Sequence, residues 1–513
     1  MRRIFLALFI SQMESSVTST AVLAITNDLG GYEKSSWLFT AYLLTYSGFP
    51  IIWAKLSDIV GRRTCLLTAL ILFLIFSAAC GAAQTMIQLI MFRWVKGVGG
   101  SGIYSLGTLV FWELLPPERW ATNASIVTGV LALSLVAGPL IGGAITESGK
   151  WRWIFLINVP IIAVASALLL WSFPRRLFNE PAAQYVSETR RAWLSPRQLR
   201  RIDVLGGALM LGLCLLLSTG LQQAALGLSW ASAYVLPLLI VAGISIIGFL
   251  AWSWYVTNRR IWPEPIFPWR FIQNRVCLGM IANAFLAGMI LSVTIVQLPQ
   301  RFMTVNGLYP LAAGVRLLPF GAFVPTGSSI AVVLMDRFKI PPTFICVAGA
   351  ILEIIGLVFL SRASGSSAVE ASQYGSQIVT AVGNGFVNTA VILMIPYVVD
   401  NRDLGVGNAT MAQFRILGGT IGISITTAAF APFVKNQLLD GLSASVVHAL
   451  LDRTGAIGRL PEATQSIVRH AFADGYNLQM KILIGIAAAH IPATLLMWRK
   501  RPIIISMKGA ERS

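Results

Sequence analysis

Long apolar segments separated by short polar connections run along almost the whole chain. Most are close to about 20 residues, the length at which an α-helix crosses about 30 Å of hydrocarbon. Because backbone polar groups must be paired within lipid, we expect each segment to be helical. The predicted spans are residues 4–26, 37–56, 64–84, 87–111, 122–146, 153–173, 204–225, 231–255, 276–299, 314–335, 343–361, 374–396, 408–431 and 479–498. The pattern therefore predicts an all-α polytopic membrane protein of about fourteen transmembrane helices.

The polar connections divide the spans into groups of six, two and six. A long connection at 432–478 repeats its apolar residues at helical spacing, which predicts amphipathic helices on the outer face. The predicted domains are an N-terminal six-helix bundle at 1–173, cytoplasmic linkers with two additional transmembrane helices at 174–275, a C-terminal six-helix bundle at 276–498 and a cytoplasmic tail at 499–513.

Composition agrees with a membrane protein, since 56% of the 513 residues are hydrophobic, only 12% are charged and the mean hydropathy is +0.73. The net charge of +18 does not indicate nucleic-acid binding, because the Lys and Arg residues lie in short connections rather than on one helix face. Cations favour the cytoplasmic side of a membrane. Their distribution predicts that both termini are cytoplasmic.

The most distinctive connection is 57–63, between the second and third spans, which contains Asp58, Gly61, Arg62 and Arg63. A turn this short can hold two helices at a fixed tilt while its cations face anionic lipid. Alternatively, its arginines simply mark a cytoplasmic loop.

Two further stretches place unusual residues inside apolar spans. Arg93 and Lys96 precede closely spaced glycines in 97–102, and the next span contains Gly138, Pro139, Gly142 and Gly143 in 138–143. No strand precedes the first glycine run, which excludes a dinucleotide-binding turn and favours close helix packing. The proline removes a backbone donor and predicts a kink.

Together these stretches resemble the major facilitator superfamily, and within it the fourteen-span drug:proton antiporters of the fungal multidrug and toxin efflux branch. Residues 151–160 are similar to that branch's entry to the sixth span, and residues 414–422 resemble its thirteenth span. The resemblance implies a major facilitator fold and alternating access powered by a proton gradient, with no cofactor or metal. It also implies that 57–63, with Glu113, forms a conformational latch and that 138–143 is the antiporter-motif kink. The sequence departs from the family at Lys96, Ser134 and Glu14, where glutamine, glycine and aspartate are usual.

Buried acids and cations supply the candidates for proton coupling, which are Glu14, Arg93, Lys96 and Glu353. An arginine inside a span costs about 2.5 to 3.5 kcal/mol on insertion scales, so Arg93 needs a partner or must snorkel to the interface. Buried carboxyls can carry protons at ordinary pH. Alternatively, Glu353 makes only a polar contact between spans. Glu113 is interpreted as a partner for the arginines near Asp58.

Other polar residues inside spans are candidates for a substrate cavity. They are Gln297, Asn384, Asn388 and Arg415. Hydrogen bonding between helices is the alternative role for the three amides.

The sequence favours a proton-coupled antiporter that exports amphipathic small molecules, such as a drug, toxin or secondary metabolite, from the plasma membrane. The expected partners are the small-molecule substrate, protons and membrane lipid, with the protein acting as a monomer. One alternative keeps the fold but imports a polar solute or serves the vacuole. A membrane enzyme is a remote alternative, because His448, His470 and His490 are scattered and form no acid–base cluster in the sequence.

Overall fold

The computed structural model describes residues 2–18, 21–30, 35–114, 120–172, 201–225, 227–259, 263–400, 403–439, 442 and 461–505. Within these ranges every regular element is a helix. The fold is therefore all-α, as the apolar pattern predicts.

The N-terminal part forms one group of helices. They are α1 (Arg2–Val17), α2 (Val22–Leu29), α3 (Ser35–Gly48), α4 (Pro50–Val60), α5 (Arg62–Ala82), α6 (Met86–Leu114), α7 (Trp120–Glu147), α8 (Trp153–Leu156) and α9 (Asn158–Ser172). The first predicted span is wrong in one respect, because α1 ends at Val17 and α2 is a separate short helix. Pro50 begins α4, which divides the second span in two because proline suits a helix start.

The remaining helices form the additional pair and the C-terminal part. They are α11 (Val204–Ala225), α12 (Val235–Arg259), α13 (Arg270–Gln273), α14 (Arg275–Thr304), α15 (Pro310–Val315), α16 (Leu318–Asp336), α17 (Pro342–Leu360), α18 (Ala371–Val398), α19 (Leu404–Leu439) and α21 (Glu462–Leu495).

Each predicted span coincides with one helix or with two consecutive helices, which fits fourteen crossings. By length and composition, nine helices in the described part of the chain could cross a membrane alone, and shorter apolar helices accompany them. The chain is thus a multi-pass integral membrane protein. The fifth predicted span contains Pro139, yet α7 continues through it from Trp120 to Glu147, so the proline does not end the helix.

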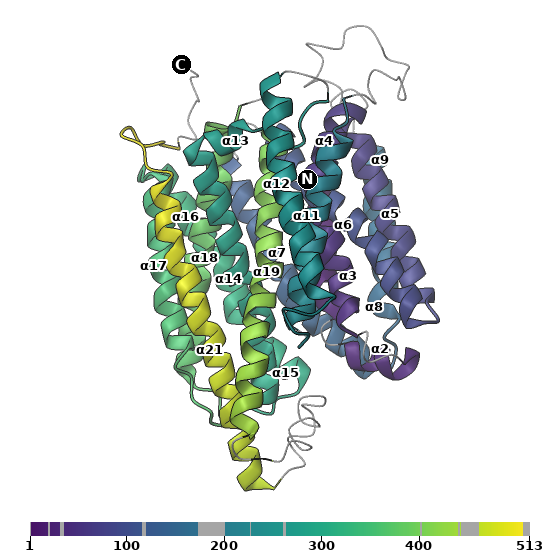
Figure 1. Cartoon of the computed structure of the whole chain (residues 1–513), viewed down its shortest axis with the longest axis vertical. Coiled ribbons are helices and arrows are strands. Elements are labelled where there is room, and N and C mark those ends of the chain that lie inside the picture. The colour runs from purple at the N-terminus through teal and green to yellow at the C-terminus, as the bar shows by residue number, and fades with distance from the viewer. Residues whose placement is uncertain are drawn as a thin grey trace.

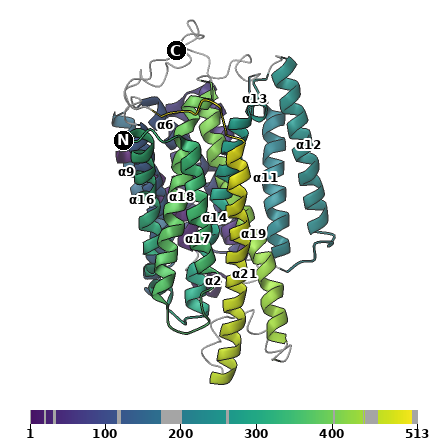
Figure 2. The same ribbon diagram turned by 90° about the vertical axis from the view of Figure 1, so that its left-hand side faces the viewer.

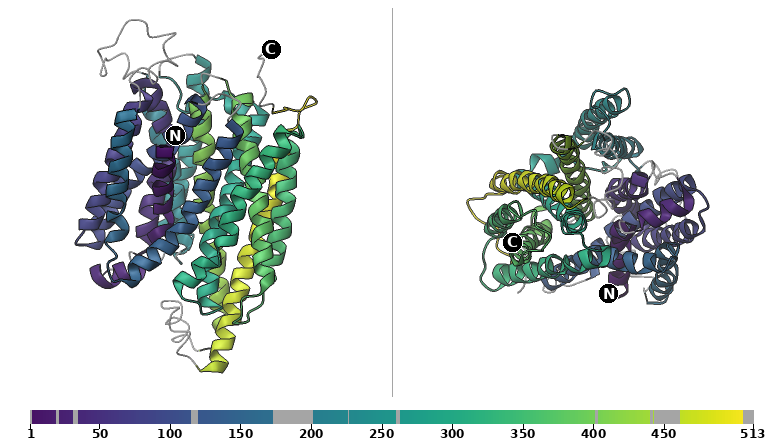
Figure 3. Two further views of the ribbon diagram at one scale, coloured as in Figure 1. Left: turned by 180° about the vertical axis from the view of Figure 1, so that it is seen from behind. Right: turned by 90° about the horizontal axis from the view of Figure 1, so that it is seen from below.

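The helices are arranged as two bundles that stand side by side (Figure 1). The start of α1 and the end of α21 lie toward the same end, as an even number of crossings requires (Figures 1 and 2). The additional helices α11 and α12 lie outside both bundles, at one edge of the view along the helices (Figure 3).

Contacts between the bundles follow two seams. On one seam α7 packs against α15, α16 and α18, and on the other α19 packs against α3, α4 and α6. Helix α11 lies over the second seam, because it contacts both α3 and α19. The apolar core there draws residues from all three parts of the chain, including Ile51, Met210, Cys214 and Met411.

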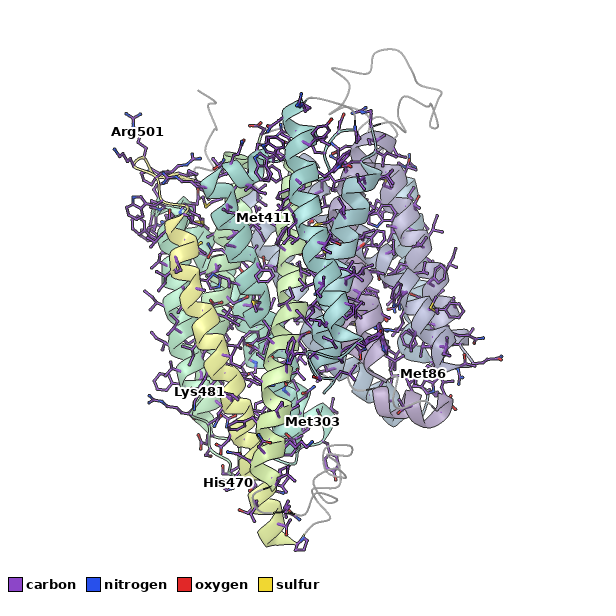
Figure 4. The ribbon with its side chains drawn as sticks, in the orientation of Figure 1. Met86, Met303, Met411, His470, Lys481 and Arg501 are labelled. Carbon is purple, nitrogen blue, oxygen red and sulfur yellow. The ribbon has the colours of Figure 1, made fainter. Side chains whose placement is uncertain are left out.

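Helices α19 and α21 extend past the other helices at the lower end of the view in Figure 1. His470 lies in this extension, while Arg501 lies at the opposite end of the molecule (Figure 4). A small apolar cluster joins the two extensions, with Val434 and Leu438 from α19 and Val468 and Phe472 from α21. Residues 432–439 and 462–478 of the predicted connection are helical, but they continue α19 and α21 rather than form separate helices. Their predicted place on the outer face stays a prediction. Residues 443–460 lie outside the described part.

Candidate functional site

A carboxylate and two cations meet inside the N-terminal bundle. Glu14 Oε1 lies 3.0 Å from Arg93 Nη1, and Glu14 Oε2 lies 2.9 Å from Lys96 Nζ. The second oxygen also accepts a 2.7 Å hydrogen bond from Asn158 Nδ2 of α9. Glu14, Arg93 and Lys96 are each 0% exposed. The structure thus brings three of the predicted coupling residues together, and we call these three with Asn158 the Glu14 cluster.

The bundle accommodates these charges because aromatic rings and backbone oxygens surround them. Arg93 donates to Leu38 O and, at 3.2 Å, to Thr18 Oγ1, and its guanidinium lies 5.3 Å from the Tyr42 ring centroid. The Lys96 ammonium lies 4.9 Å from the ring of Phe73. Cations are attracted to the negative face of such rings. Snorkelling is therefore the wrong interpretation of Arg93, because its side chain is enclosed and paired.

The antiporter-motif stretch of α7 packs against α1 beside this cluster. A Cβ on Gly138 would lie 3.0 Å from Met13 O and 2.9 Å from Val17 N, so only glycine allows this approach. Pro139 is buried next to it. Further along, Gly142 O accepts a 2.6 Å hydrogen bond from Thr146, and Gly143 has open space around it. The close contact at Gly138 fixes the distance between α7 and the helix that carries Glu14.

The C-terminal bundle contains a second buried carboxyl, Glu353 on α17. Asn384 Nδ2 of α18 donates to Glu353 Oε1 at 2.9 Å and to Ala287 O at 3.1 Å. The other carboxyl oxygen lies 3.5 Å from His490 Nε2 of α21. Glu353, Asn384 and His490 are each 0% exposed. This group is the Glu353 cluster.

The hydrogen bonds of Asn283 on α14 define which imidazole nitrogen carries a proton. Its amide nitrogen donates to Gly279 O at 2.8 Å, so its oxygen must be the acceptor for His490 Nδ1 at 2.7 Å. His490 Nδ1 is therefore protonated, and Nε2 of a neutral ring has only a lone pair to offer Glu353. One proton shared between Glu353 and Nε2 satisfies both atoms, which have no hydrogen-bond partner within the described residues.

The amides predicted for a cavity lie within the C-terminal bundle. Asn388 donates to Asn384 Oδ1 at 2.7 Å, one turn along α18. Gln297 lies 3.5 Å from Thr427 and lines a small pocket with Arg301. Asn384 and Gln297 therefore form hydrogen bonds between helices, whereas Asn388 forms its hydrogen bond within α18.

Sequence reasoning missed Asn158 and His490. Each is a single polar residue in an apolar run, as many unimportant residues are. Their only sequence signal is that a buried acid in another span requires a partner. Which span supplies that partner depends on the tertiary fold.

The predicted connection at 57–63 is shorter in the structure, where Gly61 alone separates α4 from α5, and it contains an ion pair. Arg62 pairs with Asp58 and donates to Ala54 O at 3.1 Å. Gly61 ends α4 with φ of 110°, a conformation that other residues rarely adopt. A Cβ on Gly405 would lie 3.1 Å from the Arg62 guanidinium, so this pair contacts the start of α19 in the other bundle. Arg63 follows at the start of α5 and is partly buried, whereas the Glu113 side chain lies outside the described part.

Hydrogen bonds cross between the bundles on the same side of the molecule as this loop. Asn408 of α19 donates to Thr108 of α6 at 2.9 Å, and the Ile51 amide of α4 donates to Gln413 of α19 at 3.1 Å. Arg415 of α19 donates to the Tyr104 hydroxyl of α6. These contacts hold α19 against α4 and α6 near the 57–63 loop.

Comparison with known proteins identifies the family. The model of the Major Facilitator Superfamily matches residues 4–264. The transporter FPY5 of Fusarium mangiferae, described as MFS-type, is 36% identical over 97% of this chain and 83% of its own length. The chain belongs to the major facilitator superfamily. The thioclapurine efflux transporter tcpA of Claviceps purpurea is 29% identical over 87% of this chain and 80% of its own length.

A solved structure shares the major facilitator fold. A bacterial homologue of the human lysosomal transporter Spinster superposes with a TM-score of 0.59, covers 98% of each chain and is 15% identical. This likeness and the two bundles agree with the fold that the sequence resemblance implies. The chain is a multi-pass membrane transporter that belongs with the fungal efflux proteins of the superfamily.

Proposed function

We propose that this transporter exports amphipathic small molecules in exchange for protons, with Glu14 as the coupling carboxyl. The observation that carries the proposal is the contact of Glu14 with both Arg93 and Lys96 inside the N-terminal bundle. With all three groups ionised, the cluster carries one net positive charge. A proton on Glu14 raises this to two positive charges in a low-dielectric interior, where like charges repel strongly. Proton binding therefore favours a different arrangement of α1 and α6.

The proposed cycle uses the contacts between bundles as a latch on the cytoplasmic side. The Asp58–Arg62 pair touches the start of α19, so rocking the bundles apart breaks this contact. A proton can shift the balance between two conformers only by as much as it binds one of them more tightly. Loss of the Glu14 contacts to α6 supplies that difference. Both termini are cytoplasmic in this scheme, and the membrane is the plasma membrane.

The relatives support export rather than import. The tcpA protein is named as an efflux transporter for thioclapurine, and the family includes other fungal efflux proteins. In the proposed cycle an amphipathic metabolite or toxin leaves the cell as protons enter. The alternative of polar-solute import is tested by the direction of transport.

The test uses purified protein in vesicles with an imposed proton gradient and a panel of amphipathic dyes of both charges. Glu14→Gln alone leaves two cations unbalanced, so the informative variant is the double change Glu14→Gln with Lys96→Met. This double variant keeps the net charge of the cluster. We expect it to lose gradient-driven transport while it still exchanges dye without a gradient. Lys96→Met alone is the matched control for loss of the ammonium.

Glu353→Gln provides the competing outcome. If the Glu14 double variant keeps full gradient-driven transport and Glu353→Gln abolishes it, the coupling carboxyl lies in α17 and the assignment to Glu14 is wrong. If wild-type protein accumulates dye in the opposite direction, the transporter is an importer.

A further inference from the structure

Arg415 occupies an unusual place in the first half of α19. Its backbone is pressed against α14, because a Cβ on Gly288 would lie 3.0 Å from the Arg415 Cα. A Cβ on Gly418 would lie 3.1 Å from Phe285 Cα, so a second close contact holds the same two helices together. The Arg415 side chain instead reaches across to the N-terminal bundle, where it donates to Tyr104. Two glycine contacts therefore hold this guanidinium at the seam between bundles.

The charge of Arg415 is not balanced within the part of the chain that the structure describes. The cations of the Glu14 cluster face Glu14, and Arg62 faces Asp58. No described carboxylate lies within ion-pair distance of Arg415, and its side chain is partly exposed. A guanidinium in a span without a counter-charge is costly, so such residues mark substrate or ion pathways.

A row of tyrosines leads from Arg415 into the N-terminal bundle. The guanidinium lies 5.6 Å from the Tyr104 ring centroid, which is 5.9 Å from that of Tyr46. Tyr46 in turn stacks on Tyr42 at 5.3 Å, and Tyr42 faces Arg93. Rings at these separations attract one another and present flat apolar faces. The seam thus offers a guanidinium that no described carboxylate neutralises, next to an aromatic surface.

We infer that the substrate is an organic anion with a planar aromatic body, whose negative group binds Arg415 while its rings lie against Tyr104. This inference rests on the proposed function, for which it supplies a substrate class. A carboxylate or phenolate matches the planar donors of a guanidinium. Because Arg415 and Tyr104 belong to different bundles, such a ligand contacts both bundles and binds according to their separation.

Two dyes with one ring system and opposite charge test the inference. Fluorescein is an anion and rhodamine 123 is a cation, and both contain the xanthene rings. We expect purified full-length protein to bind fluorescein more tightly than rhodamine 123 in fluorescence polarisation in mildly alkaline buffer. Tighter binding of rhodamine 123, or no binding of fluorescein by folded wild-type protein, overturns the inference.

Variants separate a substrate contact from a latch between bundles. Arg415→Gln should weaken fluorescein binding by about tenfold or more, the factor for one lost hydrogen bond to a charged group. It should not weaken rhodamine 123 binding, because it removes a charge that repels this cation. Tyr104→Phe should tighten fluorescein binding, because it removes the hydroxyl that competes for the guanidinium. If Arg415 only latches the bundles, both variants change the binding of both dyes alike, and the inference fails. Arg362→Gln, which removes an exposed arginine, is the matched control.

The same preparations keep this inference separate from the proposed export. If fluorescein binds through Arg415 but an imposed proton gradient does not drive its movement, the substrate class stands and proton coupling fails. If the gradient drives rhodamine 123 but not fluorescein, proton-coupled transport stands and the anionic substrate class is wrong.

Discussion

Glu14→Gln tests whether the Glu14 carboxylate stabilises the fold by compensating the buried charges of Arg93 and Lys96. The variant removes the carboxylate from a site where Arg93 and Lys96 lie 3.0 and 2.9 Å from it and all three side chains are enclosed. Removing one partner of a buried ion pair costs about 3 to 5 kcal/mol, because the other charge stays buried without compensation. We therefore expect the free energy of unfolding to fall by about that amount.

Lys96→Met should then offset part of the loss. In the double variant, Arg93 is the only charge of the cluster, and Leu38 O, Thr18 and Tyr42 still contact it. Residues in one network typically show interaction energies of about 0.5 to 3 kcal/mol. The double variant should accordingly be more stable than Glu14→Gln by an amount in that range.

The assay is unfolding of purified protein in detergent micelles titrated with a denaturing detergent. Glu264→Gln is the matched control, because this acid also pairs with two cations, Lys55 at 2.6 Å and Arg201 at 2.7 Å, but its side chain is 35% exposed. Exposed pairs contribute at most about 1 kcal/mol. The reasoning would be refuted if Glu14→Gln lowered the free energy of unfolding no more than Glu264→Gln does. It would also be refuted if the double variant were less stable than Glu14→Gln.

Three further predictions concern the linker, the α1 contact and the latch. Desolvation raises the pKa of Glu264, but Lys55 and Arg201 outweigh it and hold that pKa below the ordinary value of 4.5. These ion pairs therefore contribute their full stability at pH values above the ordinary pKa of a glutamate, and the contribution is lost as the pH falls through the lower folded-state pKa. The unfolding curves of wild type and Glu264→Gln should accordingly converge in acid. Gly138→Val should lower the unfolding midpoint, measured by circular dichroism, because its side chain meets the α1 backbone; an unchanged midpoint would show that α1 can move aside. Asp58→Asn should slow vesicle transport several-fold with dye affinity kept, whereas equal loss of affinity and expression would indicate a folding role.

The spans could be predicted from the sequence because a membrane helix requires an apolar segment of a certain length, which is directly visible in the sequence. Their interruptions were harder to predict. Helix α1 ends at Val17 although apolar residues continue through Ile25, and the second predicted span is divided at Pro50 into α3 and α4. In a membrane protein, neighbouring helices can satisfy backbone groups that a break or a proline leaves unpaired. Local sequence does not contain those neighbours.

The coupling candidates illustrate the same division for the site. Glu14, Arg93 and Lys96 were identified separately because each is a charge in an apolar run, and the fold places them together. His490 was set aside because the histidines are scattered in sequence, yet it faces Glu353 across two spans. The sequence shows that a residue is charged or polar. Its ion-pair or hydrogen-bond partner depends on which helix packs against it in the fold.

Helix α11 covers only one of the two seams between the bundles. It covers the seam at α3 and α19, whereas the seam between α7 and α16 has no additional helix of the described chain over it. Large apolar side chains of these two helices are exposed, such as Leu133 on α7 and Ile330 and Val333 on α16. A molecule dissolved in the bilayer therefore meets the helices of both bundles directly on the α7–α16 flank, whereas α11 lies between it and the bundles on the other flank.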